Sequence, residues 1–159
     1  MVTRDSYKQI MANWATGVTV VTTTGKDGSP CGLTVSSFTS VSLHPTLVLV
    51  CLDNRMSGLE DFKLSMKFGV SILSESQEDV SRMFARGDTP RPPDLYFEGK
   101  LGIPLLRNSL VTLECETIAI YPGGDHMIFL GQVQSADLLE VKAGKKPLVY
   151  CRGKYERLA

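Results

Sequence analysis

The stretch CGLTVSSFTSVSLHP, from Cys31 to Pro45, keeps no regular pattern for long. Six of the nine residues from Thr34 to Ser42 carry a hydroxyl group. A strand with one buried face should alternate apolar and polar residues, and a helix should repeat about every 3.6 residues. Leu33 and Val35 alternate as in a strand, but the pair Ser36–Ser37 breaks the step. We therefore expect that something other than core packing sets the pattern of this stretch.

The hydroxyl groups of this stretch have two explanations. Ser and Thr hydroxyls and the backbone N–H groups of an irregular strand can cradle a phosphate or satisfy the polar edge of a ring. Alternatively, the stretch is a solvated, threonine-rich edge strand. Composition alone favours neither explanation.

The composition of the chain is ordinary for one globular domain. Of its 159 residues, 43% are hydrophobic and 21% are charged, and 17 basic side chains balance 17 acidic ones. A nucleic-acid-binding protein would usually show a basic excess or stripe. We expect a single domain over residues 1–159 that does not bind nucleic acid.

The cysteines and the apolar runs indicate the compartment. No CxxC or Cys/His cluster occurs, so we expect neither a metal site nor a disulfide framework, and we interpret the four cysteines as buried free thiols. The longest apolar run, Leu47 to Leu52, is far too short to cross a bilayer, and the N-terminal residues have no apolar signal core. We expect a cytoplasmic protein that is not bound to a membrane.

Three helices are expected, each from a pair of residues that resembles a capping box. These pairs are Ser6 with Gln9, Ser57 with Glu60, and Ser74 with Gln77. They predict helices at about 6–15, at about 57–65 and directly after Ser74.

Strands account for most of the remaining pattern. The β-branched run Gly17–Thr24 and the segment Gly32–Val35 flank the turn GKDGSP and predict a hairpin. Further strands are predicted at 46–52, with both faces covered, and at 67–73, 110–120, 126–141 and 147–155. Gly131 is expected to mark a bulge or a close approach.

The predicted strand at 110–120 and the proline-rich segment 86–99 lead to two more expectations. In LVTLECETIAI, Val111, Leu113 and Cys115 alternate with Glu114 and Glu116, which we place on the opposite face. Separately, the prolines of the segment 86–99 predict a loop without regular structure that is too long for a simple connection.

At least six strands with three short helices predict a mostly β fold, a largely antiparallel sheet that closes into a barrel. The alternation of strand and helix is too sparse for a doubly wound fold. Neither a GxGxxG after a strand nor a GxxxxGK[ST] phosphate loop occurs.

Few side chains are suited to catalysis by themselves. His44 precedes a proline and is interpreted as a turn residue, whereas His126 follows the turn PGGD and begins a strand at a loop rim. Its ring could face a pocket or be a half-exposed spacer. No GxSxG occurs and no carboxylate pair stands out, which argues against hydrolysis. An enzyme without such groups can still work if a cofactor carries the reactive chemistry.

Several segments together resemble one known family. In chain order they are GVTVVTT, GLTVSSFTSVSLHP, TLVLVCLD, GIPLL, PGGDHMIFLGQV and PLVYCRGKY. The set resembles the flavin reductase family, which has the FMN-binding split-barrel fold and supplies two-component flavin-dependent monooxygenases. The resemblance extends from about Ala12 to Tyr155.

The resemblance implies a homodimeric, six-stranded antiparallel split barrel with a few short helices. It implies binding of FMN or FAD, hydride transfer to the flavin from NADH or NADPH, and a partner monooxygenase that receives the reduced flavin. Whether FMN or FAD, and NADH or NADPH, is preferred stays open, as does whether the flavin remains bound or exchanges.

The resemblance also implies the residues of the site. It places Thr34, Val35, Ser36 and Ser37 along the flavin, Cys51, Leu52 and Asp53 beside its ring, Ser57 at a helix N-terminus with Arg55 at its phosphate, and Phe84 and Arg86 where the flavin is covered. It places His126 beside the nicotinamide as a positioning catalytic residue, and Tyr150 as a further support for that ring. For Tyr150, ordinary packing in a barrel wall is the alternative.

For the opening stretch, the resemblance implies that Ser36 and Ser37 turn toward the flavin and that Phe38, Val41 and Leu43 return to the core. The proline-rich segment 89–99 matches no pattern of that family. A non-enzymatic flavin-binding module, for electron transfer or sensing, is an alternative on the same barrel. Relatives of pyridoxamine phosphate oxidase would need additional basic residues, and no such cluster is present.

Overall fold

The computed structural model describes residues 1–87, 90–139 and 144–158. The helices are α1 (Arg4–Met11), α2 (Leu59–Ser65) and α3 (Glu78–Ala85), with one 3-10 turn, η1 (Pro93–Leu95). The strands are β1 (Thr16–Gly17), β2 (Thr19–Thr24), β3 (Pro30–Val35), β4 (Thr39–Leu43), β5 (Thr46–Asp53), β6 (Lys67–Ile72), β7 (Tyr96–Glu98), β8 (Pro104–Leu106), β9 (Val111–Gly123), β10 (His126–Leu138), β11 (Val149–Cys151) and β12 (Lys154–Glu156). Asp88 and Thr89 of the expected loop, and the end of the expected strand 126–141 from Glu140, lie outside the described residues.

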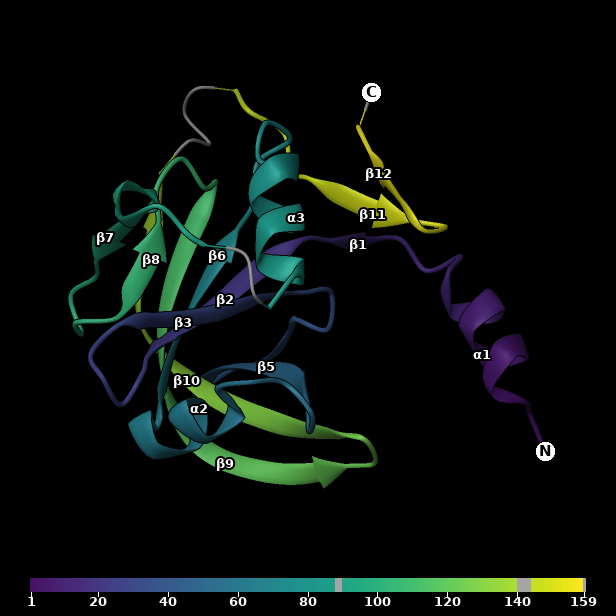
Figure 1. Cartoon of the computed structure of the whole chain (residues 1–159), viewed down its shortest axis with the longest axis horizontal. Coiled ribbons are helices and arrows are strands. Elements are labelled where there is room, and N and C mark those ends of the chain that lie inside the picture. The colour runs from purple at the N-terminus through teal and green to yellow at the C-terminus, as the bar shows by residue number, and fades with distance from the viewer. Residues whose placement is uncertain (88–89, 140–143, 159) are drawn as a thin grey trace.

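The main sheet is antiparallel and strongly curled, as Figure 1 shows. Its seven strands follow the order β3-β2-β6-β9-β10-β5-β4, while β1, β11 and β12 form a small second sheet and β7 pairs with β8. The expected mostly β class is confirmed, with seven strands in the main sheet instead of six. No ladder joins the two outer strands among the described residues, so the sheet curls like a barrel but stays split.

The outer strands β3 and β4 follow each other directly in the chain, although they lie at opposite edges of the main sheet. The chain therefore crosses the open side of the barrel between Val35 and Thr39. We call residues 36–38 the bridge. The irregular stretch of the sequence thus lies where the chain passes from one sheet edge to the other.

The predicted hairpin around GKDGSP is confirmed. Strands β2 and β3 pair in antiparallel register from Thr19 opposite Val35 to Thr24 opposite Pro30. The turn closes with a hydrogen bond from Gly25 N to Ser29 O of 2.8 Å, and Gly28 has a positive φ of 81° that favours glycine.

The core fills the inside of the curled sheet. Its largest cluster includes Val21, Val50 and three phenylalanines, and the rings of Phe62 and Phe129 meet edge to face with centroids 6.2 Å apart. At Gly131 the β9–β10 register shifts, and an added Cβ would collide with the Phe68 ring. Both expectations for Gly131, a bulge and a close approach, are confirmed.

Two of the expected capping boxes are wrong. Helix α1 is capped by Thr3, whose hydroxyl accepts a hydrogen bond from Ser6 N at 3.2 Å. Helix α2 begins after Gly58, which has a φ of 95° and no capping side chain, so Ser57 does not lie at the helix start. The third pair does interact, because Gln77 Oε1 accepts from Ser74 N at 3.0 Å, ahead of α3.

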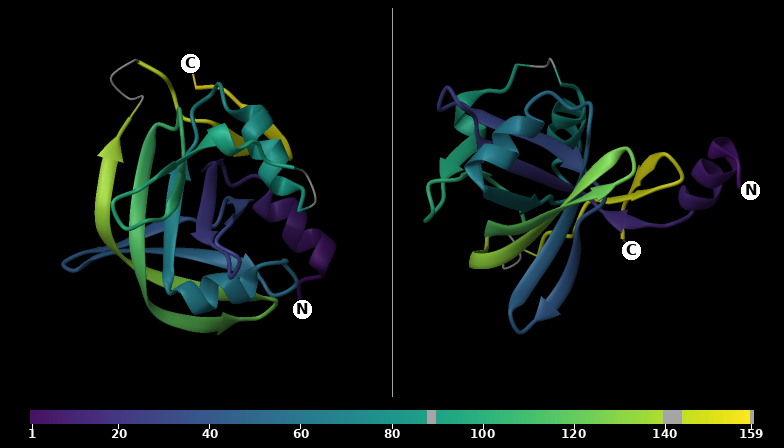
Figure 2. Two further views of the ribbon diagram at one scale, coloured as in Figure 1. Left: turned by 60° about the vertical axis from the view of Figure 1, so that its left-hand side comes forward. Right: turned by 90° about the horizontal axis from the view of Figure 1, so that it is seen from below.

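The expected return of three residues to the core is largely wrong. Phe38 packs against the core cluster, but Val41 is 47% exposed and Leu43 is 79% exposed. The reason is that β4 is an edge strand of a hairpin that projects beyond the curled sheet (Figure 2). Strand β5 is likewise fully buried only on the face of Val48, Val50 and Leu52, not on both faces.

The charged side chain of Glu114, in β9, has a structural role. It is buried, and its carboxylate accepts hydrogen bonds from the backbone N–H groups of Lys100 and Leu101, both at 2.8 Å. A buried carboxylate needs such donors to offset its loss of hydration. Glu114 therefore fastens the loop between β7 and β8 to the main sheet.

Two segments have more regular structure than expected. Within the proline-rich segment, residues 93–95 form η1 and Tyr96–Glu98 form β7, which pairs with β8. The expected last strand, 147–155, is instead the hairpin β11–β12, which turns at Arg152 and Gly153 with positive φ angles of 51° and 77°.

The four cysteines are free, as expected, but only Cys115 is buried. Burial raises the pKa of the Cys115 thiol to about 12. The other three lie half-buried. Among the described residues, none of the helices has the length and apolar character needed to cross a bilayer.

Candidate active site

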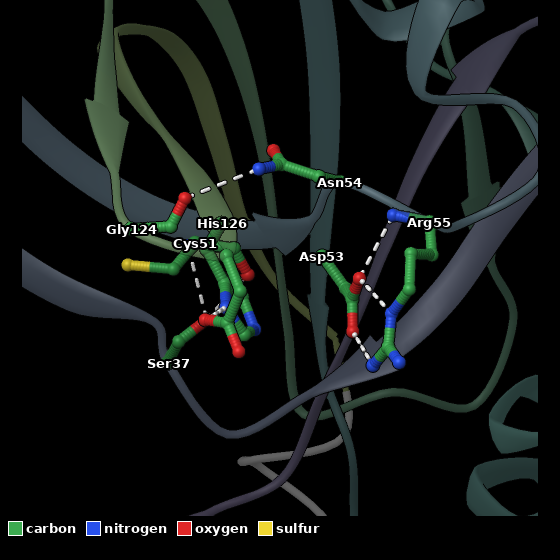
Figure 3. Close-up of polar contacts among 8 residues, drawn as sticks. Ser37, Cys51, Asp53, Asn54, Arg55, Gly124 and His126 are labelled. Atoms are coloured by element: carbon green, nitrogen blue, oxygen red, sulfur yellow. Dashed lines mark hydrogen bonds and ion pairs between the residues drawn. The ribbon is translucent and has the colours of Figure 1, made fainter.

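The bridge is fixed to β5 by a single hydroxyl group. Ser37 Oγ donates to Cys51 O and accepts from Cys51 N, both at 3.0 Å (Figure 3). The β4–β5 ladder ends at the pair Thr39 and Leu49, so Ser37 lies where the next backbone pair would form. Its hydroxyl therefore satisfies a backbone donor and acceptor that the departing strand leaves unpaired.

The three residues before Ser37, from Thr34 to Ser36, differ in whether their side chains are available to a ligand. The Thr34 hydroxyl donates to Ser81 O at 2.7 Å, which ties β3 to α3. Val35 is buried in the core. Ser36 is exposed, and its hydroxyl makes no hydrogen bond among the described residues. Of the hydroxyl groups of Thr34, Ser36 and Ser37, that of Ser36 is the one left free for a ligand among the described residues.

Two hollows lie along β3, one at its start and one at the bridge that follows its end. The first, of about 750 Å³, is bounded by the β2–β3 turn, the start of β3, residues 55–58 and the end of α3. The second, of about 920 Å³, lies between the end of α1, the bridge and Tyr150. Ser36 and Ser37 line the second hollow, while β3 runs from them into the first.

The end of β5 is held by an ion pair and by the turn that precedes β10. Arg55 donates to the Asp53 carboxylate from its backbone N, from Nε and from Nη2, at 2.8, 3.1 and 2.8 Å. These bonds hold the pKa of Asp53 well below its usual value. Asn54 Nδ2 donates to Gly124 O at 3.2 Å (Figure 3). The residues after β5 thus fix the turn before β10.

His126 is oriented by its neighbour in the chain. Its Nδ1 lies 2.7 Å from Asp125 Oδ1, and this hydrogen bond lowers the pKa of Asp125. An ionised carboxylate only accepts, so Nδ1 carries the proton and Nε2 of the neutral ring is left as an acceptor. The His126 side chain is 40% exposed and lies opposite Asp53 in the β5–β10 register.

The remaining predicted residues do not all meet at one place. The side chains of Val35 and Leu52 belong to the core, so a ligand can contact these residues only through the backbone. Arg55, Ser57 and the buried Phe84 line the first hollow. Arg86, by contrast, lies with Tyr150 in a smaller hollow on the other side of α3.

Sequence reasoning missed several residues of these hollows. Asp125 was part of the quoted PGGD turn but received no role, although its position beside a histidine was a usable signal. Lys26 and Arg91 also line the first hollow, and Trp14 lines the second. No local pattern marks these three, because distant segments bring them to the site.

A curled antiparallel sheet whose open side is crossed by a polar bridge defines a mostly β domain of the split-barrel type. The sequence model of the flavin reductase like domain matches residues 11–159. The chain therefore belongs to the flavin reductase family. The resemblance found in the sequence, from Ala12 to Tyr155, is confirmed.

The chain is similar to curated proteins and to solved structures of this family. It is 36% identical over 164 residues to an NADH-dependent FAD reductase of Streptomyces globisporus, covering 98% of this chain and 86% of that protein. It is 38% identical over 153 residues to the reductase component of the flavin-dependent trigonelline monooxygenase of Acinetobacter baylyi, covering 96% of this chain and 47% of that protein. The chain spans about half the length of that relative, and 45% of a probable flavin reductase of Rhizobium meliloti.

A solved structure extends the similarity to the fold. The NADH:FAD oxidoreductase SgcE6 of Streptomyces globisporus, in complex with NAD and FAD fragments, matches with a TM-score of 0.89 at 34% identity, over 98% of this chain and 93% of that one. The split-barrel fold expected from the resemblance is thereby confirmed.

Proposed function

We propose that this protein is an NADH:flavin oxidoreductase that transfers a hydride to FMN or FAD and supplies the reduced flavin to a separate monooxygenase. The observation that carries the proposal is the bridge, a polar crossing that lines one hollow and is joined through β3 to another, both large enough for nucleotide ligands. Membership of the flavin reductase family supports it, and so do the relatives named as an NADH-dependent FAD reductase and as a monooxygenase reductase component.

The flavin ring would lie against the bridge. The exposed Ser36 hydroxyl and the bridge backbone would bind its polar edge, while Cys51 and Asp53 come from the adjoining strand β5. The phosphate end would extend along β3 into the first hollow, toward Ser57 and Arg55. The flavin, when bound, supplies the hydride-accepting ring, and the chain supplies binding and orientation.

His126 is proposed to position the nicotinamide. Its Nε2 is an acceptor because Asp125 holds the proton on Nδ1, and an acceptor can receive a hydrogen bond from a carboxamide. Hydride passes directly between the two rings, so alignment is the main demand and no proton need come from the histidine. Tyr150 would support the same nucleotide from the second hollow.

A non-enzymatic flavin-binding module is the second candidate, because the same barrel without hydride transfer would bind flavin equally well. The oriented Asp125–His126 pair favours the enzyme, since a binding module has no need of a second, nicotinamide-directed acceptor.

The function is tested by steady-state oxidation of NADH and NADPH, with and without FMN, FAD or riboflavin. We expect NADH oxidation that depends on added or bound flavin. A protein that binds flavin but is reduced by neither nucleotide would support the module, and a protein without flavin-dependent turnover would contradict the proposed reaction.

Replacing His126 by alanine tests the positioning role. We expect the KM for NADH to rise about tenfold, as for the loss of one hydrogen bond of about 1.4 kcal/mol, while flavin affinity changes little. Asp125→Asn is the matched variant, and it should shift the KM in the same direction by a smaller factor. An equal loss of flavin affinity in His126→Ala would show that the histidine belongs to the flavin site.

The N-terminal helix supports a homodimer. Helix α1 has no buried residue and stands away from the curled sheet (Figure 1). Tyr7, Ile10, Met11 and Trp14 are all exposed, and Trp14 is 69% exposed. A short helix is not stable in water without packing of its apolar face. We propose that a second copy of the chain covers this face.

Sedimentation equilibrium checks the dimer. The expected mass is twice the 17.4 kDa of the chain, and Trp14→Ser together with Ile10→Ser should shift it toward the monomer. A wild-type mass of 17.4 kDa at micromolar concentration would contradict the proposal.

The four free cysteines support a reducing compartment, and we propose the cytoplasm as the location. Cell fractionation with an antibody against the protein checks this, and recovery from an oxidising compartment would contradict it.

A further inference from the structure

Arg91 lies in the proline-rich segment, to which the resemblance assigned no site residue. It stands between Pro90 and Pro92, and its guanidinium carbon lies 4.4 Å from the centre of the Phe84 ring. The same arginine lines the first hollow and also a neighbouring hollow of about 430 Å³. Arg91 therefore stands on the wall that the two hollows share.

Two buried polar atoms at this wall make no hydrogen bond of standard geometry. Arg91 Nε and the hydroxyl of Tyr96 are buried without a hydrogen bond among the described residues. Arg91 also forms no ion pair within the described part of the chain. Buried donors without a partner are costly. Burial raises the pKa of Tyr96, and the positive charge of Arg91, together with a polar contact between Arg91 and the Tyr96 hydroxyl, opposes that shift.

The carboxylates that line the first hollow already have partners. Asp61 accepts from the backbone N of Lys26 at 3.2 Å. Asp27 accepts from the backbone N and the hydroxyl of Ser29, at 3.0 and 2.6 Å. Both acids thus shape the β2–β3 turn. The guanidinium group of Arg91 is therefore available to an anion from outside the chain, and its planar geometry suits phosphate oxygens.

The neighbouring hollow is lined by flat, apolar groups. Pro30, Pro90 and Pro93 contribute their rings, and Tyr96 contributes an aromatic side chain. The two hollows meet at Arg91. Together they suit a ligand that has a phosphate group beside Arg91 and a flat ring in the neighbouring hollow.

We propose that Arg91 binds the diphosphate of FAD and that the neighbouring hollow takes its adenosine. The inference rests on the proposed function, because it assumes a flavin ring at the bridge. From Ser36 back to Leu33, β3 covers three residues, or about 10 Å at 3.3 Å per residue, which leads from the bridge to the first hollow. Arg91 is then the residue that selects FAD over FMN, and residues 90–96 are the specificity element.

The test is direct binding of FAD, FMN and riboflavin, without NADH, to the wild type and to Arg91→Met. We expect the wild type to prefer FAD over FMN. In the variant, the Kd for FAD should rise about tenfold, since bonds to a charged group are lost, and the Kd for riboflavin should change less than about twofold. Arg107→Met is the matched control, because Arg107 also lies over a ring, that of Phe97 at 5.8 Å, but lines none of the hollows described above.

Four results would overturn the inference. They are a wild type that prefers FMN, an Arg91→Met variant with unchanged FAD affinity, equal losses for FAD and riboflavin, and a raised KM for NADH with unchanged FAD affinity. The last result would assign the arginine to the nicotinamide nucleotide. A wild type that binds no flavin would instead contradict the proposed function itself.

Arg91→Lys keeps the experiment decisive if the methionine variant does not fold. Lysine retains the charge but not the two-pronged geometry, so FAD should bind about threefold more weakly than to the wild type, with riboflavin unchanged. Unchanged FAD affinity in this variant, together with an unfolded methionine variant, would contradict the assignment and leave Arg91 a packing residue.

Discussion

The pair of hydrogen bonds between the Ser37 hydroxyl and the backbone of Cys51 is the contact on which the site depends. Because β3 and β4 lie at opposite edges of the sheet, three residues must cross the open side of the barrel. A crossing chain cannot pair its backbone as a strand would, and the serine hydroxyl supplies both the donor and the acceptor that β5 lacks there. The crossing is thereby held in one place, where it lines the second hollow.

Strand β5 connects this bridge to the histidine. Cys51 holds the bridge, and Asp53, two residues further, lies opposite His126 and binds Arg55. Residues two apart on a strand lie about 7 Å from each other on the same face. The proposed flavin and nicotinamide sites are thus set by neighbouring positions of one strand. Asn54, which follows that strand, fixes the turn between β9 and β10.

The sequence predicted the mostly β class, the hairpin and the irregular course of the hydroxyl-rich stretch, because these depend on local composition and turns. It could not predict that Ser37 binds Cys51, since that contact joins residues 14 positions apart across a split sheet. The burial of Glu114 was not predicted, because alternation cannot reveal that loop amides bind a buried carboxylate. Ser57 was misplaced because a left-handed Gly58 starts α2 instead. Arg91 was missed because its prolines indicated only a loop.

The central claim is that Ser37 holds the bridge while Ser36 offers its hydroxyl to the flavin. Urea unfolding of Ser36→Ala and Ser37→Ala, without and with saturating FAD, tests it most directly. Without FAD, Ser37→Ala should lose about 1–2 kcal/mol of unfolding free energy and Ser36→Ala less than about 0.5 kcal/mol. FAD should then stabilise Ser36→Ala by about 1 kcal/mol less than the wild type. Equal stabilisation of Ser36→Ala and the wild type, with an unchanged Ser37→Ala, would contradict the account.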